Sequence, residues 1–283
     1  MVKTIRILLL CIGVLAAAGL CADDTGTRRG GGKPIRRSGQ IVRPDAADIR
    51  YAPKRPELVA DDPACDRLLD VYLPRAARPR AGYPCVMFIH GGGFRSGSKR
   101  SGGNLNVVCR KLLEHGIAVV SINYYLVRKY SRSKKRDMDR EVRLAAEDAE
   151  LAMKWIADHA GEYGFDLDRF AVCGGSAGAR TCFELAYIRK PEAPKIRAVI
   201  DLWGIMVSPE KIRGGTPPAL IIHGDKDRIC DIAKACAIKN RLDRLRVPNR
   251  MIVLKGRGHS QYREVAGKYM TDVIAFLNQY WER

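Results

Sequence analysis

The stretch Val172-Cys173-Gly174-Gly175-Ser176-Ala177-Gly178-Ala179 joins an apolar strand, a glycine turn with one serine at its apex, and the start of a helix. Its centre has the pattern G-x-S-x-G, in which serine occupies a sharp turn between strand and helix. Gly174 and Gly178, two residues before and after Ser176, are small because strand and helix pass closely there. Such a strained turn lifts the serine hydroxyl clear of the sheet. Ser176 is therefore a candidate nucleophile.

A second apolar stretch, upstream of this turn, ends in three consecutive glycines. Residues 85–89 (Cys-Val-Met-Phe-Ile) have the unbroken apolar pattern of a buried parallel strand. They lead into His90-Gly91-Gly92-Gly93-Phe94. Successive glycines allow backbone N–H groups to turn toward a substrate oxygen, because any Cβ would block the approach. The sequence predicts an oxyanion-binding turn at this point.

Downstream, a buried strand over 219–222 delivers two carboxylates, Asp225 and Asp227, on the loop at its end. A further strand, 251–254, is followed by His259. A serine hydroxyl is a poor nucleophile unless a base accepts its proton. Histidine generally suits this role near neutral pH, and a carboxylate on its far ring nitrogen fixes the tautomer. The chain therefore contains all three parts in order.

The other four histidines are weaker candidates for the base. His115 and His159 end predicted helices, and His90 and His223 end strands but precede glycine turns. We expect His159 to be structural, because a cation at the C-terminal end of a helix is favoured by the helix dipole. His259 differs from all four in lying on a loop after the acid.

The order of these motifs, with buried strands between them, resembles the α/β-hydrolase superfamily. More narrowly, it resembles the HGGG-type esterase/lipase branch, which holds bacterial carboxylesterases and secreted carbohydrate acetylesterases. The resemblance covers roughly residues 66–283. It implies an α/β-hydrolase fold, a mostly parallel twisted sheet with helices on both faces and a minimal lid. Alternating strands and helices along the chain also favour this architecture.

The resemblance also implies a role for each candidate residue. Asp227 fits the family spacing from His223-Gly224 better than Asp225, which we expect to cap or shape the loop. The implied set is Ser176 as nucleophile, His259 as general base, Asp227 as the acid that orients it, and the backbone N–H groups of Gly92, Gly93 and Ala177 as oxyanion hole.

The N-terminal part has a different composition. Residues 1–22 combine basic residues with an apolar core and small residues, which is typical of a cleaved secretory signal peptide. Cys21 suggests a lipoprotein anchor as the alternative, although Leu20 is bulky where such signals have a small residue. Residues 23–60 are rich in Gly, Arg and Pro, which predicts a linker or arm. The catalytic domain is then 61–283, and the protein is expected to be secreted or periplasmic.

The predicted secondary structure follows the hydrophobic periodicity. The clearest helix is 140–160, where apolar residues recur at helical spacing. An antiparallel edge strand is predicted over 68–74 because its residues alternate in polarity. The other predicted elements are strands 116–122 and 196–203 and helices 106–115, 231–245 and 264–281.

Charge and cysteine content restrict the partners. The 283-residue chain has 50 Lys and Arg against 31 Asp and Glu, a net charge of +19, with a basic cluster at 128–136. This loop is either a solvated surface or attracts an acidic polymer such as a uronic-acid polysaccharide; no motif predicts nucleic-acid binding. Nine cysteines lack the spacing of a zinc site, leaving seven after the signal segment, and their pairing is not predictable. No cofactor or transmembrane motif is found, and the oligomeric state is not predictable.

The substrate prediction depends on the short segment 204–218, where relatives that accept long acyl chains carry a helical lid. We expect hydrolysis of short-acyl esters, most simply acetyl, on a small molecule or a polysaccharide. Two alternatives stay open: an amidase, peptidase or formamidase of the same fold, and a catalytically inactive binding module.

Overall fold

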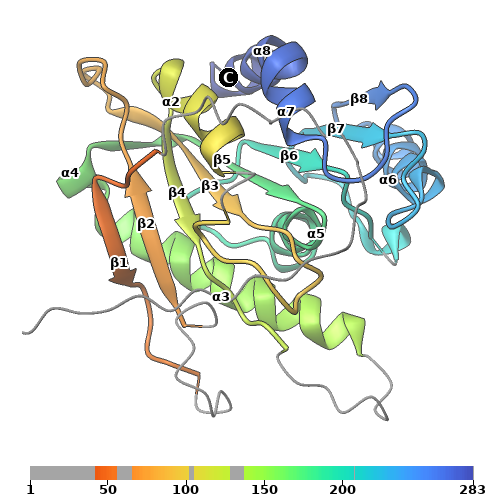
Figure 1. The fold of residues 1–283 in the computed structure, drawn as a ribbon, viewed down its shortest axis with the longest axis horizontal. Helices are drawn as coiled ribbons and strands as arrows, with labels where there is room; N and C mark the ends of the chain where they lie inside the picture. Colours follow the sequence, from red (N-terminus) through yellow and green to blue (C-terminus); the bar gives the residue numbers. More distant parts are fainter. Residues whose placement is uncertain (1–41, 56–65, 102–104, 128–136, 207, 283) are drawn as a thin grey trace, which may run out of the picture. The chain divides into compact units, whose positions relative to one another are not determined.

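The central strands β3 (Tyr83–Ile89) and β5 (Phe165–Gly175) pair in parallel and end at the two glycine motifs. In the computed structural model, the described residues form one sheet of eight strands in the order β1-β2-β4-β3-β5-β6-β7-β8 (Figure 1). The described residues are 42–55, 66–101, 105–127, 137–206 and 208–282.

The sheet is mostly parallel, as predicted. Among the strands of the described residues, only the pairings of β1 with β2 and of β2 with β4 are antiparallel. Every residue of strands β3, β4, β6 and β7 is buried, which explains their unbroken apolar sequences. The remaining strand bounds are β1 (Ala46–Arg50), β2 (Leu68–Tyr72), β4 (Ala118–Ile122), β6 (Ala198–Leu202), β7 (Ala219–Gly224) and β8 (Asn249–Leu254).

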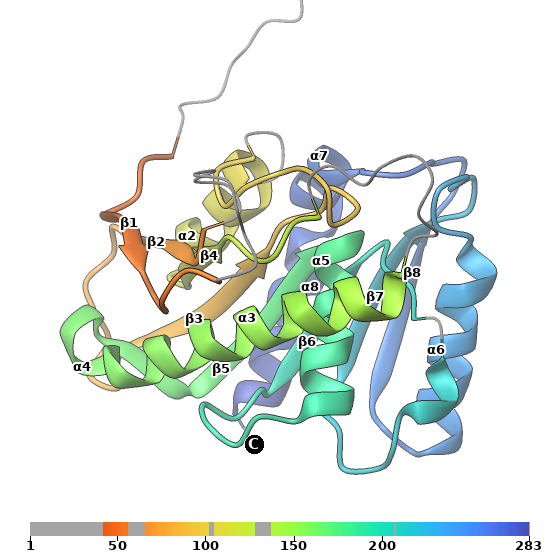
Figure 2. The same cartoon turned by 90° about the horizontal axis from the view of Figure 1, so that it is seen from below.

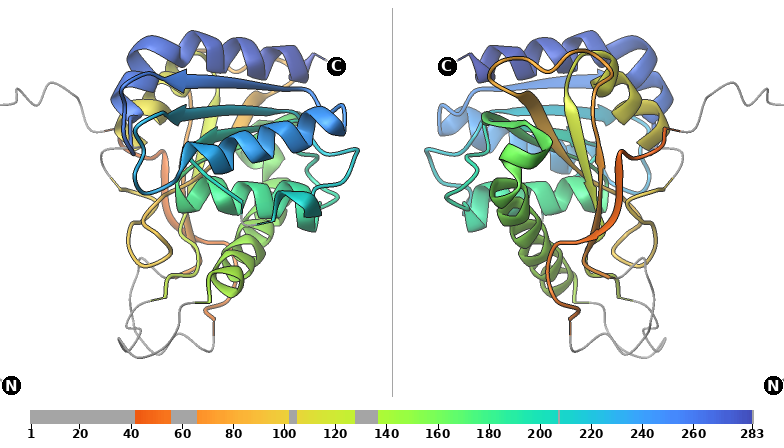
Figure 3. Two further views of the ribbon diagram at one scale, coloured as in Figure 1. Left: turned by 90° about the vertical axis from the view of Figure 1, so that its right-hand side faces the viewer. Right: turned by 90° about the vertical axis from the view of Figure 1, so that its left-hand side faces the viewer.

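Helices cover both faces of the sheet, which confirms the predicted α/β-hydrolase architecture. The ribbon views show helices on either side of the sheet (Figures 2 and 3). Buried side chains of α3, α5 and α6 belong to one hydrophobic cluster, and those of α2 and α8 belong to a second. The helical segments are η1 (Leu105–Cys109), α2 (Arg110–Glu114), α3 (Met138–Asp158), α4 (Ala160–Tyr163), α5 (Ala177–Phe183), η2 (Glu184–Arg189), η3 (Pro209–Lys211), α6 (Ile232–Arg244), α7 (Tyr262–Glu264), η4 (Val265–Tyr269) and α8 (Met270–Trp281).

Helix α3 shows how local sequence sets an element. The Asp137 carboxylate accepts a hydrogen bond from the N–H of Arg140 and caps the helix start. The helix ends at Asp158, and His159 follows with its ring stacked on Trp155 at 4.2 Å between centroids. Nδ1 of His159 lies 2.9 Å from the Trp155 carbonyl oxygen, so this histidine has the structural role predicted for it.

The first strand corrects two predictions. Because β1 (Ala46–Arg50) pairs with β2, the predicted strand over 68–74 is not at the sheet edge. The prediction that all of 23–60 is a linker or arm is wrong for this segment. The strand is not evident in the sequence because β1 has no buried residue. In addition, its pairing with β2 is irregular between Ala46 and Ile49. Its sequence therefore lacks the period of a half-buried strand.

The remaining predictions concern the N-terminal segment, the basic loop, membrane spans and cysteines. The signal segment 1–22 and the basic loop 128–136 lie outside the described residues. Across the described part of the chain, no helix has the length and apolarity needed to cross a membrane. The described cysteines are all free thiols, and Cys85 and Cys173 are buried as expected; the set is Cys85, Cys109, Cys173, Cys182, Cys230 and Cys236.

Candidate active site

Ser176 occupies a strained turn between β5 and α5. Its φ of 55° and ψ of −116° lie in a region that non-glycine residues rarely adopt. A Cβ on Gly174 would lie 2.5 Å from the backbone carbon of Gly178, and a Cβ on Gly178 would lie 2.0 Å from the carbonyl oxygen of Ile89. The need for small residues on either side of the serine is thus confirmed. The Ser176 N–H donates to the carbonyl of Leu202 at 2.9 Å and fixes the turn to β6.

The triple-glycine turn lies directly against this serine turn. A Cβ on Gly91 would be 2.9 Å from the carbonyl oxygen of Gly175. Gly92 and Gly93 have φ values of 121° and 61°, which favour glycine. Ala177 is buried and begins α5, so its N–H has no partner within the helix. The structure therefore brings the three predicted oxyanion residues to the same edge as Ser176.

Asp227 and His259 form a hydrogen-bonded pair on the loops after β7 and β8. Oδ2 of Asp227 lies 2.7 Å from Nδ1 of His259. Oδ1 accepts the N–H groups of Ile229 at 2.8 Å and Cys230 at 2.9 Å. Burial alone would raise the pKa of Asp227, but the hydrogen bonds from Cys230, His259 and Ile229 outweigh it and hold this pKa below its ordinary value. The acid is therefore kept ionised beside the imidazole.

Asp225 has the loop-shaping role that the sequence predicts. Its Oδ1 accepts the N–H of Gly256 at 2.6 Å. The N–H of Lys226 donates to the carbonyl of Arg257 at 2.8 Å, and a Cβ on Gly224 would lie 2.3 Å from that same oxygen. These contacts join the acid-bearing loop to the histidine-bearing loop.

Cys230 lies beside the candidate nucleophile, which the sequence analysis did not foresee. Its thiol lies close enough to the Ser176 side chain for the serine to oppose part of the rise in the thiol pKa. Burial, together with the negative charges of Asp227 and Asp201, raises the pKa of Cys230 to about 11, so the thiol is neutral near pH 7. Within the described residues, the Ser176 side chain has no hydrogen bond to His259. Catalytic hydrogen bonds are often long before substrate binds.

A second histidine supports the acid from the other side. Nε2 of the fully buried His223 lies 2.7 Å from the carbonyl oxygen of Cys230 and 3.4 Å from Oδ2 of Asp227. A carbonyl oxygen only accepts, so Nε2 carries the proton. Burial lowers the pKa of His223, which keeps this imidazole neutral. Nowhere in the described ranges do three or more His, Cys, Asp and Glu side chains gather as a metal site would require.

An aromatic wall supports the histidine loop. The Trp203 ring is fully buried and meets the His259 ring edge-on at 6.3 Å between centroids. Trp203 also contacts Tyr262 edge-on at 4.6 Å. A Cβ on Gly175 would lie 1.8 Å from the Tyr262 hydroxyl oxygen, so this tyrosine also packs against the serine turn. The sequence gives no signal for this wall beyond the aromatic residue types.

The chain is similar in sequence to known esterases. The BD-FAE family model matches residues 69–206. The chain is 32% identical over 148 residues to Esterase LipI of Mycobacterium tuberculosis, covering 49% of this chain and 41% of that protein. It is 27% identical over 135 residues to the ethyl acetate hydrolase of Pseudomonas putida, covering 46% and 38%. The chain thus matches less than half the length of these relatives.

Solved structures show the same fold. Esterase 2 of Thermogutta terrifontis, phosphoramylated by tabun, has a TM-score of 0.69 at 19% identity, covering 87% of this chain and 97% of that one. A truncated carbohydrate esterase from gut microbiota has a TM-score of 0.66 at 16% identity, covering 84% and 96%.

The sheet order and the serine turn show that this chain has the α/β-hydrolase fold. Over the matched regions, the chain is similar in sequence to an esterase and to an ethyl acetate hydrolase, and it shares its fold with solved esterases.

Proposed function

We propose that the protein is a serine esterase that hydrolyses short-acyl carboxylic esters, most simply acetyl esters. The observation that carries this proposal is the Asp227–His259 hydrogen bond of 2.7 Å at the sheet edge where Ser176 stands on its strained turn. An ionised acid on Nδ1 leaves Nε2 of His259 as the base, which a serine nucleophile requires.

The reaction begins when the Ser176 hydroxyl turns toward Nε2 of His259. His259 accepts the hydroxyl proton as the oxygen attacks the ester carbonyl, and the N–H groups of Gly92, Gly93 and Ala177 stabilise the resulting oxyanion. The imidazolium then protonates the leaving alcohol, which yields an acyl-enzyme and free alcohol. Water, deprotonated by the same histidine, hydrolyses the acyl-enzyme.

The names of the matched proteins support an ester as substrate. They include an esterase, an ethyl acetate hydrolase and a carbohydrate esterase. The name of the ethyl acetate hydrolase supports a short acyl group in the substrate proposed for this chain. The name of the carbohydrate esterase supports a sugar as the alcohol of that substrate. Acetylated polysaccharide is therefore the polymer that we propose to test first.

We also propose that residues 1–22 are removed and that the mature protein acts outside the cytoplasm. The apolar segment after Lys3 and Arg6 supports this proposal. N-terminal sequencing of protein from the native cell should find a start near Asp23. An intact Met1, or a lipid on Cys21, would contradict it.

The activity is tested with p-nitrophenyl acetate and with acetylated xylan, by release of nitrophenol and acetate. The parent protein should turn over, and Ser176→Ala should not, with an unchanged circular dichroism spectrum. Paraoxon should add one diethylphosphoryl group to the parent, located by peptide mass spectrometry at Ser176. Parental turnover in Ser176→Ala would exclude the proposed nucleophile, and absence of turnover on every ester and amide tested would favour a binding module.

A further inference from the structure

The loop that carries Gly92 and Gly93 is held firmly where it leaves β3. The carbonyl oxygen of His90 accepts the hydroxyl of Tyr124 at 2.8 Å, and the two rings stack at 4.4 Å between centroids. The carbonyl oxygen of Phe94 accepts the N–H of Val127 at 2.6 Å. These contacts fix the near side of the loop but leave its far side, residues 95–101, to be held by other groups.

Lys99 anchors that far side through its backbone. Its N–H donates to Oδ1 of Asn123 at 2.7 Å, and its carbonyl oxygen accepts the hydroxyl of Ser121 at 2.8 Å. Ser121 lies in β4 and Asn123 follows that strand directly. The loop is thus tied to the sheet by both backbone groups of one residue.

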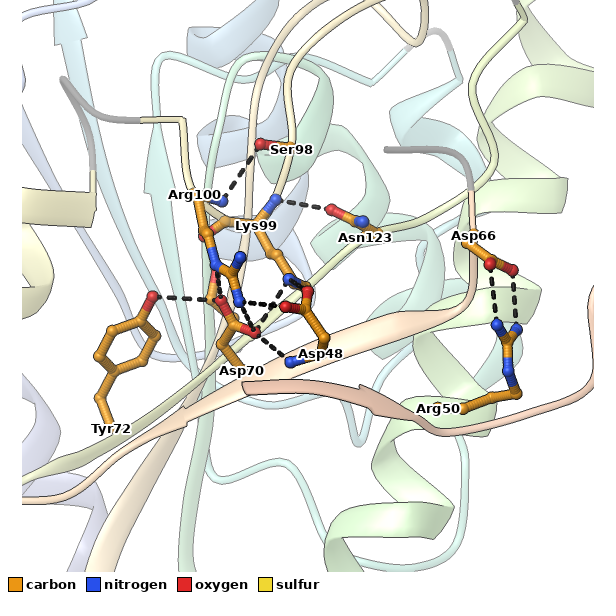
Figure 4. Close-up of polar contacts among 10 residues, drawn as sticks. Asp48, Arg50, Asp66, Asp70, Tyr72, Ser98, Lys99, Arg100 and Asn123 are labelled. Atoms are coloured by element: carbon orange, nitrogen blue, oxygen red, sulfur yellow. Dashed lines mark hydrogen bonds and ion pairs between the residues drawn. The ribbon is translucent and has the colours of Figure 1, made fainter. Parts of the chain in front are cut away.

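The side chain of Lys99 adds a cluster of ion pairs in which Lys99 and Asp70 are buried and Arg100 and Asp48 are about half exposed (Figure 4). Nζ lies 2.9 Å from Oδ1 of Asp70 and 2.5 Å from Oδ1 of Asp48. Arg100 also pairs with both acids, at 2.6 Å to Asp70 and 2.8 Å to Asp48. The two cations balance the two anions. Lys99 is 4% exposed and Asp70 is 0% exposed, so these two charges depend on each other and on their neighbours for stabilisation.

The cluster also joins the loop to the two outer strands. Asp70 lies in β2 opposite Ser121 of β4, and Asp48 lies in β1. The N–H of Asp48 donates to Oδ1 of Asp70 at 2.8 Å, at a residue whose φ is 54°. A single lysine therefore fastens the loop to β1, β2 and β4 together.

Gly97, two residues before Lys99, packs closely against the residues that precede the oxyanion turn. A Cβ on Gly97 would lie 2.6 Å from the carbonyl oxygen of Gly91 and 2.6 Å from Nδ1 of His90. The N–H of Ser96 donates to the carbonyl of Gly92 at 3.2 Å. The segment just before Lys99 thus packs against the residues just before Gly92, with no space between them for a side chain.

We propose that Lys99 is a positioning residue, and that the cluster of Lys99, Asp70, Asp48 and Arg100 sets the direction of the N–H groups of the oxyanion turn. This inference rests on the proposed function, because it assigns a catalytic consequence to the cluster. A buried ion pair contributes little net stability over an apolar pair of similar size, and in some proteins its role is to select one geometry. An oxyanion hole requires that geometry, because its donors act only within hydrogen-bond distance of the developing charge.

The decisive variant is the double substitution Lys99→Met with Asp70→Asn. It removes one charge of each sign and leaves Arg100 paired with Asp48, so no buried charge is left alone. We expect a melting temperature within a few degrees of the parent and a kcat lowered about 10- to 100-fold, below the effect of losing a whole oxyanion donor. KM should change less than threefold. Hydrogen exchange of the peptide over residues 90–97 should be faster.

A matched control separates positioning from stability. Arg169→Met breaks an ion pair with Asp166 at 2.6 Å, at the end of β5 far from Gly175. It should lower the melting temperature while kcat stays at the parental value. Parental kcat and parental exchange in the folded Lys99/Asp70 double variant would overturn the proposal.

A second variant covers the case in which the double variant does not fold. Asp48→Asn changes a side chain that is 54% exposed and leaves Lys99 paired with Asp70. It should lower kcat two- to tenfold and speed exchange over residues 90–97, and parental values of both would overturn the proposal. Hydrogen exchange needs no substrate, so a parent without esterase activity would refute the proposed function while the cluster's effect on the loop is still measured.

Discussion

Oδ2 of Asp227 faces Nδ1 of His259 at 2.7 Å, while Oδ1 of the same carboxylate accepts two backbone N–H groups, those of Ile229 and Cys230. The two oxygens are therefore not equivalent. In Asp227→Asn the amide oxygen must stay on the backbone N–H groups, because an NH₂ there would face two donors. The NH₂ would then point at Nδ1 of His259 and force the proton onto Nε2, which removes the base.

We expect Asp227→Asn to lower kcat on the order of 10⁴-fold, the effect typical of the wrong histidine tautomer in a serine triad. Asp225→Asn is the control, since that residue only supports the Gly256 turn, and it should cost less than tenfold. Steady-state kinetics on p-nitrophenyl acetate measures both. A larger loss in Asp225→Asn would show that the acid has been misassigned.

The serine and the histidine should act as one unit. Ser176→Ala and His259→Ala should each abolish most turnover, and the double variant should be hardly worse than either, because removing one member disables the other. Active-site titration with paraoxon in the same three proteins gives a second readout. Multiplicative losses in the double variant would mean that the two residues act independently.

The elements that could be predicted from the sequence are those determined by a short stretch of neighbouring residues. Strands β3, β4, β6 and β7 are buried on both faces, so each has an unbroken apolar sequence. Such a strand can be predicted without knowing which segments pack against it. The serine turn was also predictable, because close strand–helix approach requires glycine at 174 and 178 whatever the rest of the fold does. The acid–histidine pair followed from motif order along the chain.

The parts that sequence reasoning missed arise from long-range contacts. Nothing in the sequence distinguishes Lys99 from the other basic residues of this basic chain. Its burial against Asp70 follows from the fold. In the sequence, Cys230 is only a residue before a helix, yet in the fold its side chain lies near Ser176. Strand β1 has no buried residues, so no periodicity distinguishes it from the arm. To predict any of these three features, one would need to know which distant segments of the chain contact each other.

Asp201 should make stability depend on pH. It is fully buried in β6, with Oδ1 accepting the Gly204 N–H at 2.6 Å and Oδ2 without a hydrogen-bond partner among the described residues. Burial raises its pKa from 3.8 to about 7. The folded state therefore prefers the neutral acid, and this preference costs stability progressively as pH rises from 3.8 to about 7.

Asp201→Asn mimics the neutral acid at every pH. Relative to the parent, it should raise the unfolding free energy by up to about 4 kcal/mol at pH 8, from roughly three pKa units, and by almost nothing at pH 4. Urea denaturation at both pH values measures the difference. A stabilisation equal at pH 4 and pH 8 would contradict a buried acid of raised pKa.

The thiol beside the nucleophile should resist alkylation. Because Cys230 is 9% exposed and its pKa is raised to about 11, little thiolate forms at pH 7.5, and thiolate is the reactive species. Iodoacetamide should modify the more exposed Cys236 on α6 while esterase activity is kept. Peptide mass spectrometry identifies the modified residue. Activity loss in step with modification of Cys230 would show a more reactive and accessible thiol than the structure indicates.

Acyl-chain preference tests how open the site is. Between β6 and β7, the described residues after Trp203 contain a single helical turn, η3, and the stretch from Arg213 to Gly215 is exposed and polar. Burying an acyl chain gains about 0.8 kcal/mol per methylene, or roughly fourfold in kcat/KM. A segment this short and polar offers little apolar surface to a long chain, so each added methylene should gain less than twofold.

The measurement is a series of p-nitrophenyl esters from acetate to dodecanoate, with Ser176→Ala as the control for uncatalysed hydrolysis. We expect kcat/KM to peak at roughly two to four carbons, because the pocket rewards only the first few methylenes. A maximum at eight carbons or beyond would mean that another part of the chain covers the site. Such a maximum would point to a lipase and contradict the proposed preference for short acyl groups.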